Sequence, residues 1–416
     1  MRGLLGKKLS HSYSKVVHEK IDGIEYNLIE VDDLDSFFRE NNFEALNVTI
    51  PYKYDVIKYL DSIEESAALI ESVNTIVRRD GLLKGYNTDI DGLIFLLEYY
   101  HINIQNVVVG ILGNGATSRT IKFVCETLGA KEVKVFARKP KVTEHNLQDT
   151  SEFSTIEVLF NSTPVGMYPH VDDQLIIDIL SFPHLSVLID LIYNPLRTRL
   201  MISAQDNGIR AVNGLMMLIH QAVKANEYFN NVVHSKAKTI EIYNNILLNK
   251  INIVLIGMPM SGKSYYSRAV SNLYQKDLVD IDLLIEETSS KSIPEIFNDL
   301  GESLFRKLET DTIKKVSISH NLAISTGGGV ILNKENIDYL RQNGIIIFLD
   351  MPLSELKKCN PKNRPLLKDP KNIEKLYNDR YPLYYKYCDK RVVKRGFKRQ
   401  ETLESIEVKI NEYINS

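Results

Sequence analysis

A phosphate-binding loop is the clearest chemical signal in the chain. Residues 257–264 read Gly-Met-Pro-Met-Ser-Gly-Lys-Ser directly after the apolar run 251–256, and they fill every fixed position of G-x-x-x-x-G-K-[ST]. In such a loop the backbone N–H groups wrap nucleotide phosphates, the lysine reaches the terminal phosphates and the serine binds magnesium. We therefore predict a nucleotide site formed by Met258, Pro259, Met260, Ser261, Gly262, Lys263 and Ser264.

Two carboxylates in a D-x-D arrangement, Asp280 and Asp282, follow this loop. Side chains on a strand alternate between its two faces, so we expect both carboxylates on one face. One could serve the metal ion and the other an acceptor hydroxyl. The spacing by itself is also typical of a strand edge or a helix cap.

A second nucleotide-type loop follows the apolar run 107–112 and reads Gly113-Asn114-Gly115-Ala116-Thr117-Ser118. The first glycine permits a tight turn, the second lets the backbone approach a pyrophosphate, and the next helix offers its N–H groups. Ser118 takes the place of the usual third glycine, and ordinary strand-to-helix turns share this pattern. The cations Arg138 and Lys139 follow the next expected strand and favour a 2'-phosphate, so we predict NADP(H).

Short apolar runs alternate with amphipathic stretches along the whole chain, as expected for parallel sheets flanked by helices. We predict strands at 107–112, 133–136, 158–160, 187–191 and from 251, and helices at 118–128, 215–228 and 236–248. The new strand at Ile251 places a domain boundary near Lys250.

Length and composition predict a folded chain of two to four domains, because it has 416 residues, 44% hydrophobic and 25% charged. Residues 1–250 carry 25 basic and 31 acidic side chains, and residues 251–416 carry 26 basic and 22 acidic ones. This excess of positive charge in the second half is too small to indicate a nucleic-acid-binding surface. The three cysteines lack metal or disulfide spacing, and no stretch reads as a signal peptide or membrane span. We expect a cytoplasmic protein that acts on small molecules.

An ordered series of motifs runs through the first half of the chain. The motifs are 12–14 (Ser-Tyr-Ser), 47–53 (Asn-Val-Thr-Ile-Pro-Tyr-Lys), 73–75 (Val-Asn-Thr), 85–89 (Gly-Tyr-Asn-Thr-Asp), 161–167 (Asn-Ser-Thr-Pro-Val-Gly-Met) and 214–217 (Gly-Leu-Met-Met). In these motifs the chain resembles shikimate dehydrogenase over residues 2–240. The resemblance implies Lys53 and Asp89 as the catalytic pair and a shikimate pocket made of Ser12, Ser14, Thr49, Asn74, Tyr193 and Gln221.

Reduction of a ketone needs hydride from the cofactor and a proton for the developing alkoxide. Lys53 could give that proton and Asp89 could orient the substrate hydroxyl. The chain departs from the family around the cofactor, with Ala116-Thr117 for the usual Gly-Ala and 137–139 (Ala-Arg-Lys) for Asn-Arg-Thr.

The second half of the chain adds further motifs to the phosphate loop. They are 301–309 (Gly-Glu-Ser-Leu-Phe-Arg-Lys-Leu-Glu), 325–330 (Ser-Thr-Gly-Gly-Gly-Val), 364–367 (Arg-Pro-Leu-Leu) and 380–384 (Arg-Tyr-Pro-Leu-Tyr). From residue 251 to about 395 the chain resembles shikimate kinase. The resemblance implies ATP, Mg2+ near Ser264 and Asp280, a lid carrying Arg364, and a shikimate site made of Asp282, Arg306, Gly328, Gly329 and Arg380. Arginines suit a carboxylate substrate because their planar fork matches it.

Together the two resemblances imply an α/β fusion. We predict a substrate domain at 1–95 completed by helices at about 214–248, a Rossmann-like NADP domain at 96–213, and a P-loop kinase domain at 251–416. The implied substrates are 3-dehydroshikimate and shikimate, and a homodimer is possible. Two alternatives stay open: a dehydrogenase half of altered cofactor or quinate preference, and a non-catalytic half that regulates the other.

Overall fold

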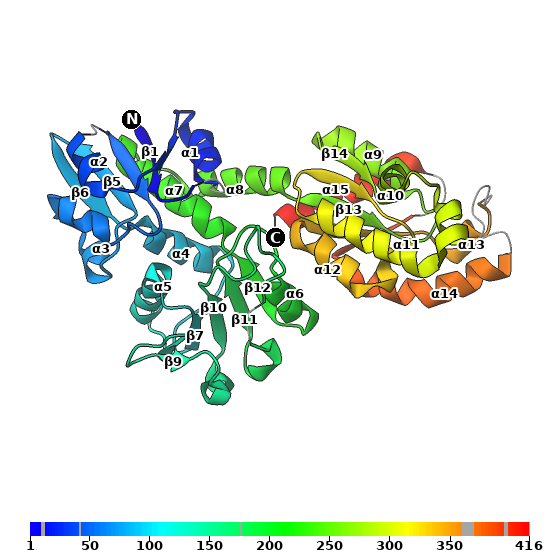
Figure 1. The fold of residues 1–416 in the computed structure, drawn as a ribbon, viewed down its shortest axis with the longest axis horizontal. Helices are drawn as coiled ribbons and strands as arrows, with labels where there is room; N and C mark the ends of the chain where they lie inside the picture. The colour runs from blue at the N-terminus through cyan, green and yellow to red at the C-terminus, as the bar shows by residue number, and fades with distance from the viewer. Residues whose placement is uncertain (10–12, 41–42, 175–176, 360–369, 395–397, 416) are drawn as a thin grey trace. The chain divides into compact units, whose positions relative to one another are not determined.

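The computed structural model describes residues 1–416 except 10–12, 41–42, 175–176, 360–369, 395–397 and 416 (Figure 1). It divides into two compact units. The first consists of Met1–Tyr193 and Ser203–Ile246, and the second of Asn194–Ile202 and Leu247–Ser416. Both are layered α/β structures, which confirms the predicted fold class.

The first sheet of unit 1 has the strand order β2-β1-β3-β5-β6-β4. Its strands are β1 Arg2–Gly6, β2 Asn27–Glu30, β3 Ala45–Val48, β4 Ser62–Ile63, β5 Thr75–Arg79 and β6 Leu82–Tyr86. Strand β3 pairs with β1 in parallel and with β5 in antiparallel orientation, and all four of its residues are buried. The segment that follows β3, which includes Lys53, therefore leaves from the middle of the sheet.

Among the described residues, the first sheet is accompanied in the chain by six helices and a short turn. They are α1 Ser14–Asp22, α2 Leu34–Glu40, α3 Glu65–Leu69, α4 Thr88–Tyr99, α7 Leu215–Asn230 and α8 Lys236–Lys250, with a short 3-10 turn, η1, at Asp55–Tyr59. Helices α7 and α8 confirm the predicted helices at 215–228 and 236–248. Helix α4 packs closely on α7 at Gly92, where an added methyl group would lie 2.7 Å from the Met217 carbonyl oxygen and 3.0 Å from Cβ of Gln221.

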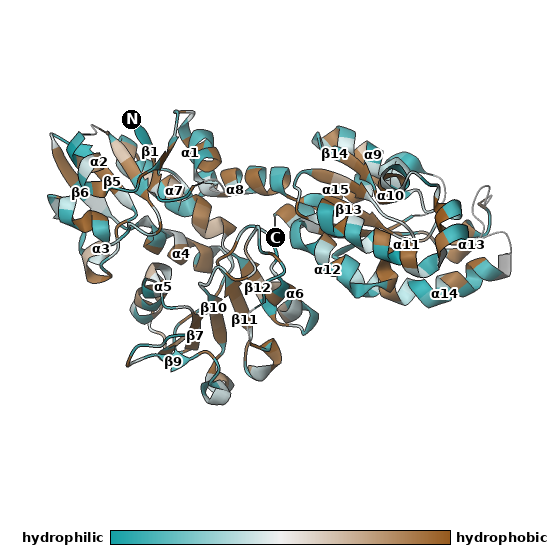
Figure 2. Ribbon diagram, viewed as in Figure 1, coloured by the Kyte–Doolittle hydropathy of each residue, from teal (hydrophilic) through white to brown (hydrophobic). Residues whose placement is uncertain are grey.

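The second sheet of unit 1 is parallel throughout, in the order β12-β11-β10-β7-β8-β9. Its strands are β7 Val108–Leu112, β8 Glu132–Ala137, β9 His145–Asn146, β10 Val158–Asn161, β11 Val187–Asp190 and β12 Arg210–Asn213; its helices include α5 Ala116–Thr127 and α6 Arg199–Asp206, with 3-10 turns η2 Thr150–Thr155 and η3 Ile179–Ser181. Figure 2 shows β7, β10 and β11 in the colour of hydrophobic residues. Parallel strands buried on both faces read as such continuous apolar runs, which is why the sequence predicts them.

Unit 2 contains a parallel sheet in the order β14-β15-β13-β16-β17. Its strands are β13 Asn252–Ile256, β14 Asp277–Asp280, β15 Leu322–Ser325, β16 Gly344–Asp350 and β17 Lys390–Val393. Its helices are α9 Lys263–Tyr274, α10 Ile281–Ser289, α11 Ile293–Ser317, α12 Lys334–Asn343, α13 Leu353–Leu356, α14 Pro370–Tyr387 and α15 Arg399–Ile414, with the turn η4 at Val330–Leu332. Since the strands are parallel, the loops after β13, β14 and β15 emerge at one edge of the sheet. Within the described ranges, no helix is long and apolar enough to span a bilayer.

A short segment far from the phosphate loop in sequence completes unit 2. Arg197 is buried and forms two hydrogen bonds to Asp389, at 2.7 and 3.1 Å, across 192 residues of chain. It also donates to the Gly344 carbonyl oxygen at 2.6 Å, where β16 begins. Burial by itself would raise the pKa of Asp389, but attraction to Arg197 and the hydrogen bonds outweigh burial and lower that pKa. The pair therefore joins the starts of β16 and β17 to residues 194–202.

We expect Arg197→Met to destabilise unit 2 by about 3–5 kcal/mol, because it leaves Asp389 buried without its cation. This loss of stability is measured by urea unfolding, with the loss of nucleotide binding as the signal. The stabilisation is present at neutral pH and should be lost as the pH falls through the depressed pKa of Asp389. The double variant Arg197→Met/Asp389→Leu should recover part of the loss, since no unpaired charge then remains; equal stability of Arg197→Met and wild type would contradict the prediction.

Candidate functional sites

The predicted pair Lys53 and Asp89 meets in unit 1. Nζ of Lys53 lies 2.5 Å from Oδ2 of Asp89, and the two side chains are 14% and 12% exposed. Lys53 follows β3 in a turn that contains the cis Ile50–Pro51 peptide, and its carbonyl oxygen accepts from the Val73 N–H at 2.8 Å. Asp89 lies in the first turn of α4, where the Asn87 side chain accepts its N–H at 3.0 Å. A base and an acid thus share one partly buried position.

Amide side chains form the wall next to this pair. Oδ1 of Asn74 accepts from the Thr88 N–H at 2.8 Å, and Thr88 also lies 3.5 Å from Oε1 of Gln221. The Asn74 side chain is buried, and among the described residues nothing accepts a hydrogen bond from its Nδ2. Nδ2 is therefore available to a ligand oxygen. Thr49 belongs to the same turn as Lys53, and its N–H donates to the Leu5 carbonyl oxygen at 2.9 Å.

Two tyrosines connect the Ser-Tyr-Ser motif to the end of the second sheet. The rings of Tyr13 and Tyr193 meet edge to face, with centroids 6.0 Å apart. Burial, with a smaller contribution from Tyr13, raises the pKa of Tyr193 to about 12, so its hydroxyl stays protonated. Ser14 begins α1 and is buried, whereas Ser12 lies outside the described residues. The structure thus places Tyr193 beside the predicted Ser14 turn.

The close approach of α4 and α7 yields a prediction for Gly92. A methyl group there meets the backbone of α7, which cannot rotate away, so Gly92→Ala should push Gln221 from Thr88. We expect a stability loss of about 1–3 kcal/mol and a higher KM for shikimate. Steady-state kinetics tests this, with KM for NADP and the phosphorylation rate as internal controls. An unchanged KM for shikimate would show that the α4–α7 spacing does not set this site.

The loop 113–118 connects β7 to α5 and has the geometry of a dinucleotide turn. Gly113 has φ 101°, and a methyl group there would lie 2.9 Å from Oγ of Ser162. Gly115 is the N-cap of α5, and a methyl group on it would meet no atom within 4 Å. Ala116, Thr117 and Ser118 form the first turn of α5. Open space at Gly115 beside a helix N-terminus suits a pyrophosphate.

Arg138 and Lys139 follow β8 next to this loop, as predicted. The Asn114 side chain donates to the Lys139 carbonyl oxygen at 3.2 Å and to Oε2 of Glu144 at 2.9 Å. The same Glu144 oxygen accepts from the Lys141 N–H at 2.8 Å. We did not foresee Glu144, because no motif marks it and it comes several residues after the strand. It puts a carboxylate beside Asn114 of the dinucleotide loop.

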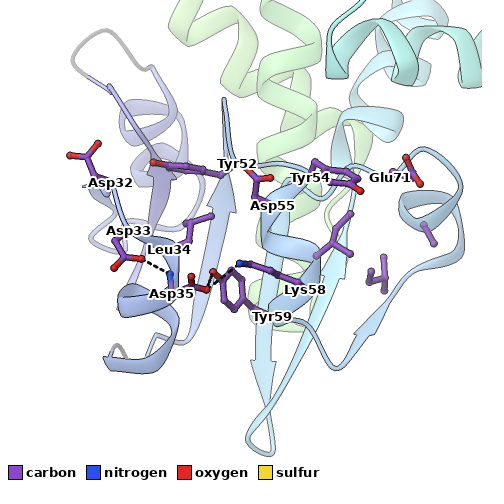
Figure 3. A pocket seen from close by; sticks show the side chains of 13 residues that line it. Asp32, Asp33, Leu34, Asp35, Tyr52, Tyr54, Asp55, Lys58, Tyr59 and Glu71 are labelled. Carbon is purple, nitrogen blue, oxygen red and sulfur yellow. Dashed lines mark hydrogen bonds and ion pairs between the residues drawn. The ribbon is translucent and has the colours of Figure 1, made fainter.

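The cavity in Figure 3 is not the predicted substrate site. It measures about 850 Å³ and none of the predicted site residues lines it. Its wall is acidic, with Asp32, Asp33, Asp35, Asp55 and Glu71, and Lys58 and Tyr59 point toward Asp35 (Figure 3). Such a wall repels an anionic substrate.

In unit 2 the phosphate loop connects β13 to α9 as predicted. Three of its residues have positive φ: Gly257 (149°), Met260 (72°) and Gly262 (95°). Lys263 is buried, and its Nζ donates to the carbonyl oxygens of Gly257 at 2.9 Å and Met258 at 3.1 Å. These carbonyl contacts hold the lysine across the mouth of the loop, near where terminal phosphates would lie.

Ser264 and Asp280 lie together at the edge where the parallel strands end. Oγ of Ser264 lies 2.8 Å from Oδ2 of Asp280 and 3.1 Å from Oγ of Ser325. Mg2+ prefers oxygen ligands, keeps several waters, and is usually held by one or two carboxylates together with phosphates. The hydroxyl and carboxylate oxygens at this position fit that ion.

The reason we gave for grouping Asp280 with Asp282 is wrong. Asp280 ends β14 and caps α10, and Asp282 lies in the first turn of α10. Oδ1 of Asp280 accepts from the Asp282 N–H at 3.1 Å. The two carboxylates are therefore brought together by a helix cap and not by the alternation of a strand. Their separate surroundings agree with separate roles.

The motif 301–309 delivers a cation and a buried acid to the glycine loop after β15. Nη1 of Arg306 lies 2.9 Å from Oε2 of Glu309, whose side chain is 1% exposed. Burial raises the pKa of Glu309 although Arg306 opposes this. A methyl group at Gly327 would lie 2.7 Å from Oδ1 of Asp282 and 3.2 Å from Oε1 of Glu309, and one at Gly329 would collide with Arg306. Asp282, Arg306 and Glu309 thus converge on this loop. Glu309 lies in the motif 301–309, but from the sequence we assigned it no role.

Helix α14 approaches the same loop from another side. Arg380 donates to the Gly328 carbonyl oxygen at 2.8 Å, and the Tyr384 hydroxyl donates to it at 2.5 Å. A methyl group at Gly328 would lie 2.8 Å from Cδ of Pro259 in the phosphate loop. The glycine loop therefore lies between the phosphate loop and the arginines. Arg364, predicted on a lid, lies outside the described residues.

These sites define two classes of enzyme in one chain: a Rossmann-type oxidoreductase and a P-loop phosphotransferase. Comparisons with known proteins agree. Residues 4–76 match the family model "Shikimate dehydrogenase substrate binding domain", and residues 259–411 match "Shikimate kinase". The shikimate dehydrogenase (NADP(+)) of Clostridium beijerinckii is 38% identical over 245 residues, 54% of this chain and 90% of that protein. The shikimate dehydrogenase (NADP(+)) of Clostridium perfringens is 37% identical over 254 residues, which cover 55% of this chain and 92% of that protein.

Solved structures show the same relationship. A chorismate mutase/shikimate 5-dehydrogenase fusion protein from Clostridium acetobutylicum has 33% identity and a TM-score of 0.54, covering 59% of this chain and 96% of that one. Shikimate dehydrogenase 1 from Peptoclostridium difficile has 32% identity and a TM-score of 0.53, and the match covers 59% of this chain and 97% of that one. The chain belongs to the shikimate dehydrogenase family and also carries a shikimate kinase domain. It is a bifunctional enzyme of the shikimate pathway.

Proposed function

We propose that the chain catalyses two consecutive reactions. The first half reduces 3-dehydroshikimate to shikimate with NADPH, and the second half phosphorylates the shikimate 3-hydroxyl with ATP and Mg2+. The observation that carries this proposal is that each unit holds its own convergent set of ligand-facing groups. Unit 1 has the Lys53–Asp89 pair, and unit 2 has Asp282 and Arg306 around the glycine loop. Because both sets suit one product, each assignment supports the other.

In the first reaction NADPH supplies the hydride when it is bound. Lys53 holds a proton at Nζ, which it gives to the alkoxide oxygen that develops on the substrate. Asp89 accepts from Lys53 at 2.5 Å and so aims Nζ into the pocket. Asn74 offers Nδ2 to a ring hydroxyl, and the half-buried Tyr193 limits the access of water while keeping its own proton. General acid–base help of this kind contributes about 10² to 10⁴ in rate.

In the second reaction Mg2+ neutralises charge on the phosphates of ATP when both are bound. Lys263 exchanges its loop carbonyl partners for phosphate oxygens, and Asp282 accepts the proton of the attacking hydroxyl. Arg306 and Arg380 bind the substrate carboxylate, and Glu309 holds the Arg306 fork in place. The protein therefore acts mainly by positioning and by supplying positive charge.

Glu144 favours a second possibility for the cofactor. A carboxylate near the adenosine ribose accepts its 2'-hydroxyl and disfavours a 2'-phosphate, and Glu144 lies beside Asn114 of the dinucleotide loop. A dehydrogenase half that accepts NAD would follow. Initial rates with NADP and NAD, each with shikimate and with quinate, separate the two possibilities.

A coupled assay on the purified chain tests the proposed function. The mixture contains 3-dehydroshikimate, NADPH, ATP and Mg2+, and both NADPH loss and ADP formation are followed. We expect ADP to appear only after NADPH consumption begins, because the kinase substrate is the product of the first reaction. If either signal is missing when the corresponding substrate is added directly, that half of the proposal fails.

A further inference from the structure

A second lysine reaches the phosphate loop of unit 2 from outside the loop. Lys394 follows β17, and its side chain is buried. Its Nζ donates to the Ser261 carbonyl oxygen at 3.3 Å and lies 5.4 Å from the centroid of the Tyr266 ring. Its backbone N–H donates to the Asp350 carbonyl oxygen at 2.8 Å, which fixes the point where the side chain starts.

Among the described residues, no carboxylate pairs with this ammonium group. Within the part of the chain that the structure describes, Lys394 forms no ion pair, and the Ser261 carbonyl is the single acceptor for its three donors. Burial lowers the pKa of Lys394; Cys359 has a smaller effect that raises this pKa, and Arg399 a smaller effect that lowers it further. A buried cation is costly unless it is paired. An anion bound nearby would remove much of that cost.

The position of Lys394 shows where such an anion would bind. A methyl group on Gly262 would lie 3.2 Å from the Tyr266 ring and 3.4 Å from Nζ of Lys394, so both side chains pack against this glycine. Gly262 is the N-cap of α9, whose N-terminus carries partial positive charge. Two lysines, Lys263 and Lys394, therefore lie at a helix end that by itself repels cations. A strongly anionic ligand would make this arrangement favourable.

We propose that Lys394 is a positioning residue of the nucleotide site: it fixes the Ser261–Gly262 peptide and adds positive charge behind the loop that holds the polyphosphate. This inference rests on the proposed ATP-dependent activity. Lys394 acts through the loop backbone and through its charge, and Lys263 remains the lysine that contacts the terminal phosphates. Its contribution should therefore scale with the number of phosphates on the ligand.

Calorimetry on the full-length chain with ATP, ADP and adenosine tests the inference. We expect Lys394→Met to weaken ATP binding about tenfold, the size of one charge-assisted contact, and adenosine binding to stay unchanged. KM for ATP should rise by the same factor while KM for shikimate does not change. Lys394→Gln keeps a donor for the Ser261 carbonyl without the charge, so it should fall between Lys394→Met and wild type.

Lys390→Met is the matched control, because this lysine begins the same strand but pairs with Glu412 at 3.5 Å, away from the loop. It should bind ATP as wild type does. Wild-type ATP affinity in Lys394→Met, or an equal loss for ATP and adenosine, would overturn the inference; if Lys394→Met does not fold, the same comparison is made with Lys394→Gln. A wild-type chain that neither binds nor turns over ATP would instead overturn the proposed kinase activity.

Discussion

Lys53→Met should reduce dehydrogenase turnover by about 10² to 10⁴, because the substrate oxygen loses its proton donor. Methionine has nearly the same length as lysine, so the turn after β3 and the pocket wall keep their shape. The neighbouring Asn74 and Gln221 are held by Thr88 and not by Lys53, so shikimate should still bind. The measurement is the steady-state rate of NADPH oxidation with 3-dehydroshikimate, together with equilibrium binding of shikimate.

Lys58→Met is the control for this experiment. Lys58 lies five positions further on, exposed at the surface, where it pairs with Asp35 at 3.1 Å. Its loss should leave both activities unchanged. In Lys53→Met the phosphorylation rate should also stay at the wild-type level, because that reaction uses the other unit. A dehydrogenase rate unaffected by Lys53→Met would support the alternative in which this half only senses shikimate.

The sequence predicted the parts of the fold that depend on local pattern. The apolar run 107–112 became β7, and the phosphate loop lies between β13 and α9, because buried parallel strands and glycine turns have clear local signatures. Lys53 and Asp89 were paired by resemblance, and their 2.5 Å contact supports that pairing. The periodicity of the sequence alone would have left both residues as surface charges.

The parts that the sequence did not predict depend on long-range contacts or on caps. No local pattern connects Arg197 to Asp389, which is 192 residues away. The buried ion pair, together with the hydrogen bond from the Leu196 N–H to Asn343, shows that residues 194–202 complete unit 2. The spacing of Asp280 and Asp282 suggested a strand, but the Asp280 side chain caps a helix instead. A D-x-D sequence fits either structure, and the hydrogen bonds to the N–H groups of the next turn decide between them.

Lys263→Met should lower the phosphorylation rate by about 10² to 10³, the usual loss when one preorganised charge at a reacting group is removed. In the structure Lys263 binds the Gly257 and Met258 carbonyl oxygens, which are weaker acceptors than phosphate, so it is ready to exchange them for ATP. The effect should be mainly on kcat, because the charge on the transferred group is greatest in the transition state. ADP formation at saturating shikimate measures it.

Lys409→Met controls for loss of a positive charge, since Lys409 pairs with Glu412 on the surface of α15 at 2.8 Å. The dehydrogenase rate of Lys263→Met, measured on the same preparation, shows whether the chain is folded. A Lys263 variant that phosphorylates shikimate at the wild-type rate would exclude this loop as the catalytic phosphate site. Comparing it with Lys394→Met then separates the two lysines. At saturating ATP, Lys263→Met should still turn over slowly, whereas Lys394→Met should reach the wild-type rate.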